Sequence, residues 1–417
     1  MEYKTTKEYA KNLDRKDTLA KYRNQFHIPL QKNGEEYIYF CGNSLGLQPK
    51  KTKEYVDQEI IDWANLGVEG HLNAKNPWLP YHEFLSSGYA NLLGAKASEV
   101  IAMNTLTVNL HLMMISFYNP TKEKFKIIIE SDAFPSDIYA VESQIRLHNL
   151  DINKSLIKIK PRKGETIIRI QDIENLIEKE GDKTTLILLG GVNYYTGQVF
   201  EMKKITEQAQ KKNIKVGFDL AHAIGNIRLN LHKWGVDFAV WCSYKYLNSG
   251  PGSIGGAYIH EKHHSAHLPR LCGWWGHNKD DRFKMPKKFN PIKTAEGWQL
   301  SNPPILSLAA IRSSLSIFDE VSMEKLIVKS KNQSKYLRDL LKTINTERIE
   351  IITPEDSGCQ TSIRVKYGNK LLYEKISEEG IIADWREPDV IRIAPVPLYN
   401  SYLDIYKFYK ILHKLIK

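Results

Sequence analysis

The sequence predicts an α/β protein whose larger domain contains a mostly parallel β-sheet covered by helices on both faces. Short runs rich in Ile, Val and Leu alternate with helical stretches through the middle of the chain. These runs are continuously apolar, which is typical of strands buried on both faces. The chain has 417 residues, more than one compact core usually holds, so we also expect a second, smaller domain.

The elements of the larger domain follow one another in the order that a parallel sheet requires. Helices are predicted at 138–147 and 202–213, where they connect strands on the same sheet. This part of the chain runs from roughly residue 50 to residue 300. The predicted strands are KIIIE (126–130), TTLILLG (184–190), IKVGFDL (214–220), VDFAVWCS (236–243) and SIGGAYIH (253–260).

The pattern changes after the proline-containing segment SNPPILSL (301–308). A long helical run over 314–343 leads to strand-like segments within 347–354, 361–368 and 380–397, and then to a final helix. We therefore expect a smaller α/β C-terminal domain. The predicted division is an N-terminal segment (1–45) packing with the small domain, a large domain (46–305) and the small domain (306–417).

Composition and charge argue against several classes of function. The net charge of +11 arises from scattered lysines without a continuous basic stripe, so it favours anionic substrates over nucleic acid. The chain begins without an apolar signal segment and contains no apolar run of the ~18 residues that a membrane span needs. We expect a soluble, cytoplasmic protein with no membrane contact and no bound metal. The cysteines are too far apart for a zinc or disulfide motif: Cys41, Cys242, Cys272 and Cys359.

Ionisable side chains follow two successive predicted strands. Asp219 and His222 follow one strand, and Lys245 and a glycine-rich turn follow the next. Pyridoxal phosphate needs a lysine for its aldehyde and an anionic partner for its ring nitrogen. Taken singly, the aspartate is typical of a turn residue, the lysine of a solvent-exposed side chain and the histidine of a core residue. Together at the ends of strands, the three favour a site for this cofactor.

Two further features suit the same cofactor. The helix predicted within 103–114 begins with Thr105 and Thr107, and helix N-termini with small hydroxyls bind phosphate. An ordinary helix cap has the same pattern. Phe134 is a candidate to stack on the ring, although any buried phenylalanine would look the same.

Ten segments spread over the whole chain, in the same order, make it resemble the kynureninase family of fold-type-I pyridoxal-phosphate enzymes. Related cysteine desulfurases and class V aminotransferases carry a histidine before the lysine, where this chain has Tyr244. The resemblance implies a seven-stranded, mostly parallel sheet in the large domain. The segments are FCGNSLGLQPK (40–50), WANLGVEGH (63–71), MNTLTVNLHLMM (103–114), FPSDIYAVESQI (134–145), GVNYYTGQ (191–198), GFDLAHAIGN (217–226), WCSYKYLNSGPGSIGG (241–256), RLCGWWGH (270–277), LSNPP (300–304) and RIAPVPLYNS (392–401).

The resemblance also implies residue roles. Lys245 would carry the cofactor as a Schiff base and move protons at the substrate Cα, and Asp219 would pair with the ring nitrogen beside His222. Phe134 would stack on the ring. The cofactor and its phosphate would be lined by Leu106, Thr107, Ser136, Asp137, Tyr195 and Tyr244.

Other implied roles concern the substrate and a second subunit. Trp274 and Asn302 would reach the cofactor from the partner in a homodimer. Arg392 would bind the substrate α-carboxylate, and Ser44, His71 and Asn302 would lie near its aryl ring. The chain departs from the family at Gly190, where a small hydroxyl residue is frequent, so we expect modestly weaker cofactor binding.

The implied reaction is hydrolysis of L-kynurenine, 3-hydroxy-L-kynurenine or both, to anthranilate or 3-hydroxyanthranilate and L-alanine, in tryptophan catabolism. Water adds to the γ-carbonyl and the Cβ–Cγ bond breaks, with Tyr195 and His71 as candidate bases. The sequence leaves the preferred substrate and the use of the product open. The alternatives are another fold-type-I enzyme, such as an aminotransferase or a cysteine desulfurase using Cys242 or Cys272, and a non-catalytic binding protein of the same fold.

Overall fold

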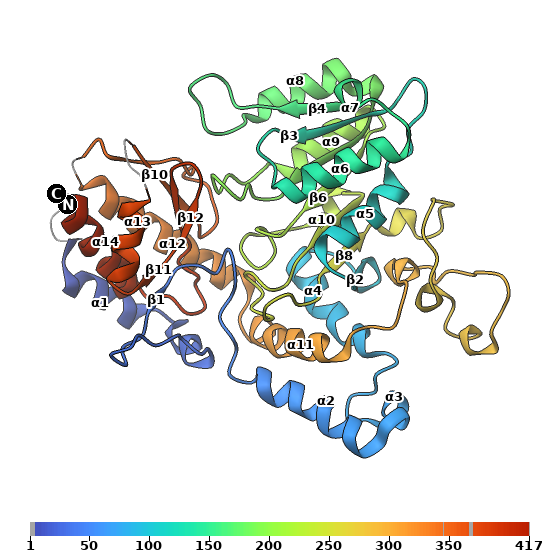
Figure 1. Cartoon of the computed structure of the whole chain (residues 1–417), viewed down its shortest axis with the longest axis horizontal. Coiled ribbons are helices and arrows are strands. Elements are labelled where there is room, and N and C mark those ends of the chain that lie inside the picture. The colour runs from blue at the N-terminus through green and yellow to red at the C-terminus, as the bar shows by residue number, and fades with distance from the viewer. Residues whose placement is uncertain (1–4, 345, 367–369, 417) are drawn as a thin grey trace.

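A computed structural model describes residues 5–344, 346–366 and 370–416. The chain forms a large α/β region and a smaller region that combines the blue N-terminal and red C-terminal segments (Figure 1). None of the helices in the described residues has the length and apolarity needed to cross a membrane. Residues 1–4 of the predicted N-terminal segment, and 367–368 of the predicted strand segment 361–368, lie outside the described residues.

The large region is built on a seven-stranded sheet. Its strand order is β2-β8-β7-β6-β5-β3-β4, and β8 is antiparallel to both of its neighbours while the other strands share one direction. The prediction of a mostly parallel sheet is confirmed. The strands are β2 (Val100–Ala102), β3 (Lys126–Glu130), β4 (Leu156–Ile159), β5 (Thr184–Gly190), β6 (Lys215–Asp219), β7 (Phe238–Trp241) and β8 (Gly256–Ile259).

Both faces of the sheet are buried, as the continuously apolar strands predict. On β3, Ile127 and Ile129 pack in one core and Ile128 in the other, because successive side chains of a strand point to opposite faces. Helices α5 and α6 contribute to the first core, and α4, α8, α9 and α11 to the second. The helices of this region are α2 (Thr52–Leu66), α3 (Gly70–Asn73), α4 (Ser86–Leu93), α5 (Leu106–Phe117), α6 (Pro135–Leu147), α7 (Ile152–Ser155), α8 (Ile170–Glu180), α9 (Met202–Lys211), α10 (Leu231–Trp234) and α11 (Ile305–Glu320).

The smaller region contains a four-stranded antiparallel sheet in the order β12-β13-β10-β9. The N-terminal segment joins it, since β1 pairs in parallel with β11 and Ala10 of α1 lies in the same core as Leu412 of α14. The elements are α1 (Lys7–Lys16), β1 (Ile38–Tyr39), α12 (Met323–Lys342), β9 (Ile349–Ile351), β10 (Thr361–Val365), α13 (Leu371–Glu378), β11 (Ile381–Ile382), β12 (Asp384–Arg386), β13 (Val390–Ile393) and α14 (Tyr402–Ile416).

The prediction of one long helical run over 314–343 is wrong in one respect. The run is two helices, because α11 ends at Glu320 and α12 begins at Met323. Ser322 lies between them, and its hydroxyl accepts a hydrogen bond from the backbone N–H of Lys325. A serine N-cap of this kind starts a new helix, and the chain changes direction there. Helix α11 packs with the large-region core and α12 contributes Leu337 and Leu340 to the small one.

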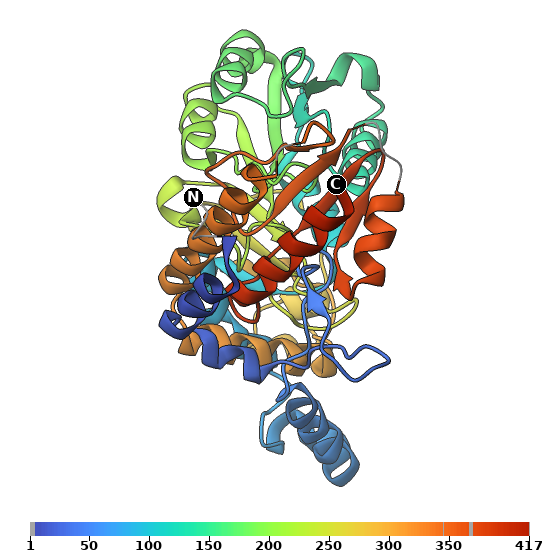
Figure 2. The same cartoon turned by 90° about the vertical axis from the view of Figure 1, so that its left-hand side faces the viewer.

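Part of the large region forms a projecting arm. Helices α2 and α3 extend away from the body of the molecule in both views (Figures 1 and 2). The arm leaves large apolar side chains in solvent, with exposed fractions of 64% for Trp63, 76% for Val68 and 65% for Leu72. Such a surface is unusual for a monomer.

Candidate active site

A cavity of about 220 Å³ lies at the carboxyl ends of strands β5, β6 and β7. Open α/β sheets bind their ligands at this edge. Residues of the N-terminal segment and of β12 close the cavity from the other side. Its lining comprises Asn43, Ser44, Leu106, Thr107, Glu130, Phe134, Ser136, Asp137, Gly190, Val192, Tyr194, Asp219, Ala221, His222, Tyr244, Lys245 and Arg386.

Lys245, His222 and Asp219 meet in this cavity. Strands β6 and β7 are adjacent, with Asp219 opposite Val240, so the segments that follow them emerge side by side. The Nζ atom of Lys245 lies 3.0 Å from Nε2 of His222. Burial lowers the pKa of His222 well below its ordinary value and the charge of Lys245 lowers it further, so the imidazole is neutral. The histidine can therefore exchange hydrogen bonds with the amine without adding a second charge.

Two buried carboxyl groups face the lysine. Burial raises the pKa of Asp137 well above its ordinary value, and the neighbouring carboxylate of Asp219 raises it further. Burial also raises the pKa of Asp219, although its carboxylate accepts a hydrogen bond from the N–H of Ala221 at 2.7 Å. Two carboxylates that are close together and shielded from water favour a shared proton or a cation between them. A protonated ring nitrogen would supply that cation.

Two helices point their N-termini into the same cavity. Leu106 and Thr107 begin α5, and Ser136 and Asp137 lie in the first turn of α6. The hydroxyls of Thr107 and Ser136 are 2.9 Å apart. Thr105 occupies the N-cap position of α5, but its side chain makes no capping bond to the helix. The ordinary-cap alternative is thus not supported, and the unsatisfied N–H groups of two helices make this corner suitable for a phosphate.

Aromatic side chains complete the walls. The ring of Phe134 lies 5.9 Å from Nζ of Lys245 and contacts Tyr194 edge to face at 5.4 Å. The phenylalanine is 44% exposed and lines the cavity. Burial raises the pKa of Tyr244, so its hydroxyl remains a neutral hydrogen-bond donor.

Five residues predicted for the site do not line this cavity within the described chain: Tyr195, His71, Trp274, Asn302 and Arg392. Tyr195 lines a neighbouring cavity of about 330 Å³, and its hydroxyl donates a hydrogen bond to Asp389 at 2.9 Å. His71 lies on the projecting arm, where it contacts Trp78 edge to face. Trp274 and Asn302 lie at the surface. Arg392 is only 1% exposed, and it donates a hydrogen bond at 2.7 Å to the backbone carbonyl of Tyr194, a lining residue.

Six lining residues were not predicted as site residues: Asn43, Glu130, Val192, Tyr194, Ala221 and Arg386. Glu130 had a usable signal, because it ends the apolar strand KIIIE as Asp219 ends its own strand. Tyr194 adjoins the predicted Tyr195, and the one-residue choice between them depends on a turn that the sequence does not specify. Arg386 comes from the other sheet, so only the packing of the two regions brings it here.

The contact with Glu130 explains the glycine at position 190. The backbone N–H of Gly190 donates a hydrogen bond to the carboxylate of Glu130 at 3.1 Å, and a Cβ atom at position 190 would lie 3.0 Å from the same carboxylate. Asn193 donates to the other oxygen of Glu130 at 3.0 Å. Burial raises the pKa of Glu130 to about 7. The carboxyl group of Glu130 therefore occupies the space into which a side chain at position 190 would extend.

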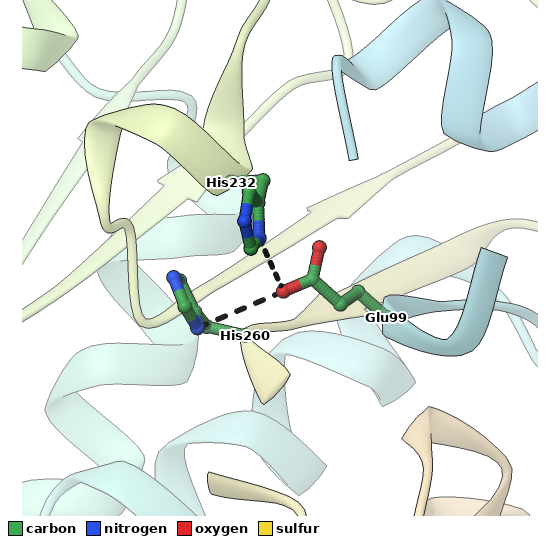
Figure 3. A group of neighbouring side chains, drawn as sticks. All are labelled: Glu99, His232 and His260. Carbon is green, nitrogen blue, oxygen red and sulfur yellow. Dashed lines mark hydrogen bonds and ion pairs between the residues drawn. The ribbon is translucent and has the colours of Figure 1, made fainter. Parts of the chain in front are cut away.

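A second group of ionisable side chains lies away from the cavity (Figure 3). The buried carboxylate of Glu99 lies 2.9 Å from Nδ1 of His232 and 3.6 Å from Nδ1 of His260. Its two oxygens also accept the backbone N–H groups of Lys96 and Glu261, and Nδ1 of His260 accepts the N–H of Lys262. These bonds connect the start of β2 to α10 and to the end of β8, so we assign the group a structural role.

The residues of the cavity fit pyridoxal phosphate, the cofactor that the sequence predicts. Nδ1 of His222 and Oδ1 of Asp137 are buried without a hydrogen-bond partner among the described residues, and such atoms need a polar ligand. The lysine amine, the paired carboxylates and the two helix N-termini correspond to an aldehyde, a protonated ring nitrogen and a phosphate.

Comparison with known proteins agrees with this reading of the cavity. Residues 326–412 match the family model described as Kynureninase C-terminal domain. The chain is 52% identical to a kynureninase of Flavobacterium psychrophilum, with 99% of each chain covered. It is 50% identical to one of Myxococcus xanthus, covering 98% and 97%, and 45% identical to one of Nematostella vectensis, covering 99% and 94%.

Solved structures show the same fold at low sequence identity. A structure of C-DES with glycine covalently linked to its PLP cofactor is 15% identical and superimposes with a TM-score of 0.79, covering 94% of this chain and 98% of that one. A cysteine desulfurase of Thermococcus onnurineus gives 17% identity and a TM-score of 0.77, covering 95% and 97%. These two structural similarities establish the fold alone. The sequence identities of 45–52% over nearly the full length of the three kynureninases establish the family. The chain belongs to the kynureninase family.

Proposed function

We propose that this protein is a pyridoxal-phosphate-dependent hydrolase that cleaves L-kynurenine, 3-hydroxy-L-kynurenine or both, releasing the aryl acid and L-alanine. Membership of the kynureninase family over nearly the full length carries this proposal. The cavity supports it by placing one lysine beside a neutral histidine and two buried carboxyl groups. The products would be anthranilate or 3-hydroxyanthranilate.

The residues that would hold the cofactor are those of the cavity. Lys245 would bond to the aldehyde of the cofactor, and Phe134 would lie against the cofactor ring. Asp219 would pair with the ring nitrogen, next to Asp137. Leu106, Thr107, Ser136 and Tyr244 would surround the phosphate. When bound, this group stores the electron pair released at the substrate Cα and so makes the Cα and Cβ bonds reactive.

The protein residues would then bind, orient and move protons. Nζ of Lys245 is the group that would take the Cα proton, and the neutral His222 next to it would accept a hydrogen bond without repelling the lysine cation. Arg392 would bind the α-carboxylate of the substrate, and Ser44 would lie near the aryl ring of the substrate. Tyr195 remains the proposed base for the γ-carbonyl, although its hydroxyl is bonded to Asp389 and must turn to reach the cavity.

We also propose a homodimer with shared active sites. Two apolar surfaces are available: the arm with Trp63, Val68 and Leu72, and the loop with Leu271, Trp274, Phe283 and Met285. Trp274 and Asn302 lie outside the cavity of their own chain, so their role at the cofactor requires a partner copy. The position of His71 on the arm makes its contact with an aryl ring depend on the same assembly.

The division of the chain and its location are proposals as well. We propose the parts 1–45, 46–305 and 306–417, with α11 connecting the last two, which the pairing of β1 with β11 supports. A cytoplasmic location is supported by the four cysteines, all of which are free thiols.

The direct test is to supply the purified holoenzyme with L-kynurenine and, separately, with 3-hydroxy-L-kynurenine. We expect anthranilate or 3-hydroxyanthranilate together with an equal amount of L-alanine, and the ratio of kcat/KM values would give the preferred substrate. No aryl product from either compound would refute the proposal. Formation of L-alanine from L-cysteine, with sulfide released when a thiol reductant is added, would instead favour the desulfurase alternative.

That alternative has little support in the cavity. A desulfurase requires a cysteine that reaches the substrate, and neither predicted candidate lines the cavity. Cys242 is buried beside the end of β7, and burial raises the pKa of its thiol. Cys272 is exposed on the loop before Trp274. The aminotransferase alternative differs in its products, which the same assay separates.

A further inference from the structure

The substrate cavity contains a guanidinium group that the predicted roles do not use. Arg386, at the end of β12, lines the cavity together with Lys245, His222 and Tyr194. Its side chain is 36% exposed, so it is open to the cavity and to solvent. A buried carboxylate-binding site needs a positive charge in contact with the ligand, and a guanidinium meets a carboxylate with two parallel hydrogen bonds.

Both terminal nitrogens of Arg392, the arginine that family resemblance assigns to the α-carboxylate, already have partners in this conformation. One of its terminal nitrogens donates to the carbonyl of Tyr194 at 2.7 Å, and the other forms an ion pair with Asp384. The side chain is 1% exposed. A carboxylate that enters the cavity therefore meets Arg386 before it can reach Arg392.

Asp384 connects the two arginines. In the antiparallel pair of β12 and β13, Asp384 is directly opposite Arg392, and Arg386 lies two residues further along β12. One oxygen of Asp384 pairs with Arg392 and lies 3.1 Å from Nη2 of Arg386. Two guanidinium groups thus share one carboxylate, which leaves one positive charge without a local counter-charge.

An unsatisfied hydrogen-bond donor points to the same conclusion. Nε of Arg386 is buried and has no partner among the described residues, and the same is true of Nε of Arg392. Buried N–H groups of charged side chains are costly when unpaired, so these two atoms favour an incoming acceptor. Both arginines also lie close enough to His222 to help lower the pKa of that histidine.

We propose that Arg386 binds the substrate α-carboxylate directly, so that the carboxylate site consists of two arginines held in place by Asp384. This inference rests on the proposed function for the identity of the substrate. Arg386 makes the first contact, and Arg392 is linked to it through their shared partner Asp384. The site would accept any α-amino acid with a free carboxylate, while the rest of the cavity selects the side chain.

The test compares two probes that differ only at the carboxylate: L-alanine and L-alaninamide. Both are titrated into the holoenzyme while the absorbance of the bound cofactor is followed. We expect the native protein to bind L-alanine more tightly, and Arg386→Gln to lose about 10- to 100-fold in affinity for L-alanine only, because a hydrogen bond to a charged group is worth about 1.5–3 kcal/mol. Arg386→Lys should recover part of the loss, since it restores the charge without the fork.

Controls separate this contact from other effects. Arg228→Gln removes the same charge from an exposed arginine that pairs with Glu324, and should bind both probes as the native protein does. The affinity of apoenzyme for pyridoxal phosphate should be unchanged in Arg386→Gln, whereas a loss there would assign Arg386 to the phosphate and overturn the proposal. Circular dichroism checks that each variant is folded. If Arg386→Gln does not fold, Arg386→Lys replaces it in the titrations.

Failure of the carboxylate proposal and failure of the proposed function give different results in these experiments. If Arg386→Gln keeps the native preference for L-alanine over L-alaninamide, Arg386 does not contact the carboxylate, even if kynurenine is cleaved. If kynurenine is not cleaved but the preference depends on Arg386, the carboxylate site stands and the substrate assignment fails. With kynurenine as substrate, the expected change is a raised KM with a smaller change in kcat.

Discussion

At the scale of single residues, the proposed chemistry depends on the amine of Lys245. Lys245 has its Nζ atom 3.0 Å from a neutral histidine and shares the cavity with two carboxyl groups. Lys245→Ala removes both the covalent link and the group that moves the Cα proton. We expect turnover to fall by at least about 10²-fold, since general acid–base catalysis contributes that much or more.

The measurement is the rate of aryl product formation, with the thermal midpoint as a check on folding. Lys211→Ala is the matched control, because that lysine is exposed at the end of α9 and its amine donates a hydrogen bond to Gln208 in the same helix. Turnover near the native rate in Lys245→Ala would exclude Lys245 from the reaction. A lowered thermal midpoint in both variants would instead indicate a general effect on stability.

Glu130 predicts a pH dependence of stability. Burial raises the pKa of Glu130 to about 7 from an ordinary value of 4.5, so between these pH values the folded protein holds a proton that the unfolded chain has released. Stability is therefore lost as the pH rises through this window, by up to about 3 kcal/mol. Glu130→Gln keeps a neutral side chain of the same shape and removes this loss.

Urea unfolding of the apoenzyme at pH 5 and pH 8 measures the effect. We expect Glu130→Gln to gain stability relative to the native protein as the pH rises, while Glu123→Gln, at an exposed position, follows the native protein at both pH values. An equal difference between Glu130→Gln and native protein at both pH values would show that Glu130 does not titrate in this window.

At the scale of secondary-structure elements, two helix N-termini form the predicted phosphate corner. Thr107 on α5 and Ser136 on α6 place their hydroxyls 2.9 Å apart at the cavity wall. Thr107→Val and Ser136→Ala each remove one hydrogen-bond donor to a charged group. We expect each to weaken pyridoxal-phosphate binding by about 10-fold or more.

Titration of apoenzyme with the cofactor, followed by absorbance, gives the dissociation constants. Ser143→Ala on α6 is the control, since its hydroxyl bonds to the carbonyl of Ala140 within the helix. If Thr107→Val and Ser136→Ala bind the cofactor like Ser143→Ala, the phosphate lies elsewhere.

The elements themselves were predictable where a periodic signal was strong. Continuously apolar strands such as 184–190 gave the buried sheet, and the helix at 202–213 followed from Met202, Ile205 and Ala209 facing one core. The short strands β2 and β4 and the break at Ser322 were not predicted. Three or four residues carry little pattern, and a single cap residue inside a helical run is easily taken for helix.

At the scale of the whole molecule, the exposed apolar surfaces predict a dimer. The arm with Trp63 and Leu72 and the loop with Trp274 have no covering partner among the described residues. Substituting Trp63 and Leu72 together by glutamate places two charges on the proposed interface, and we expect a monomer with strongly reduced turnover. Sedimentation and the kynurenine assay measure the two effects.

Leu30→Glu is the matched control, because Leu30 is also 63% exposed but lies in the N-terminal segment away from the arm and the loop. The double variant should keep a native circular dichroism spectrum. A native protein that sediments as an active monomer would overturn both the dimer and the assignment of Trp274 and Asn302 to a shared site.

The sequence by itself determined the fold class and the positions of Lys245 and Asp219 at the edge of the sheet that forms the cavity. These follow from local order, because the residue after each buried strand must emerge at the edge where a parallel sheet binds its ligands. Asp219, His222 and Lys245 could be found in this way, and Glu130 carries the same signal.

Only the tertiary structure decided which distant residues meet there. Arg386 and Ser44 reach the cavity through the packing of the small region on the large one, and Tyr195, His71, Trp274, Asn302 and Arg392 do not line it in this chain. Strand periodicity fixes where a side chain leaves its own sheet. Contacts between sheets depend on how two cores pack against each other, which no local pattern in the sequence encodes.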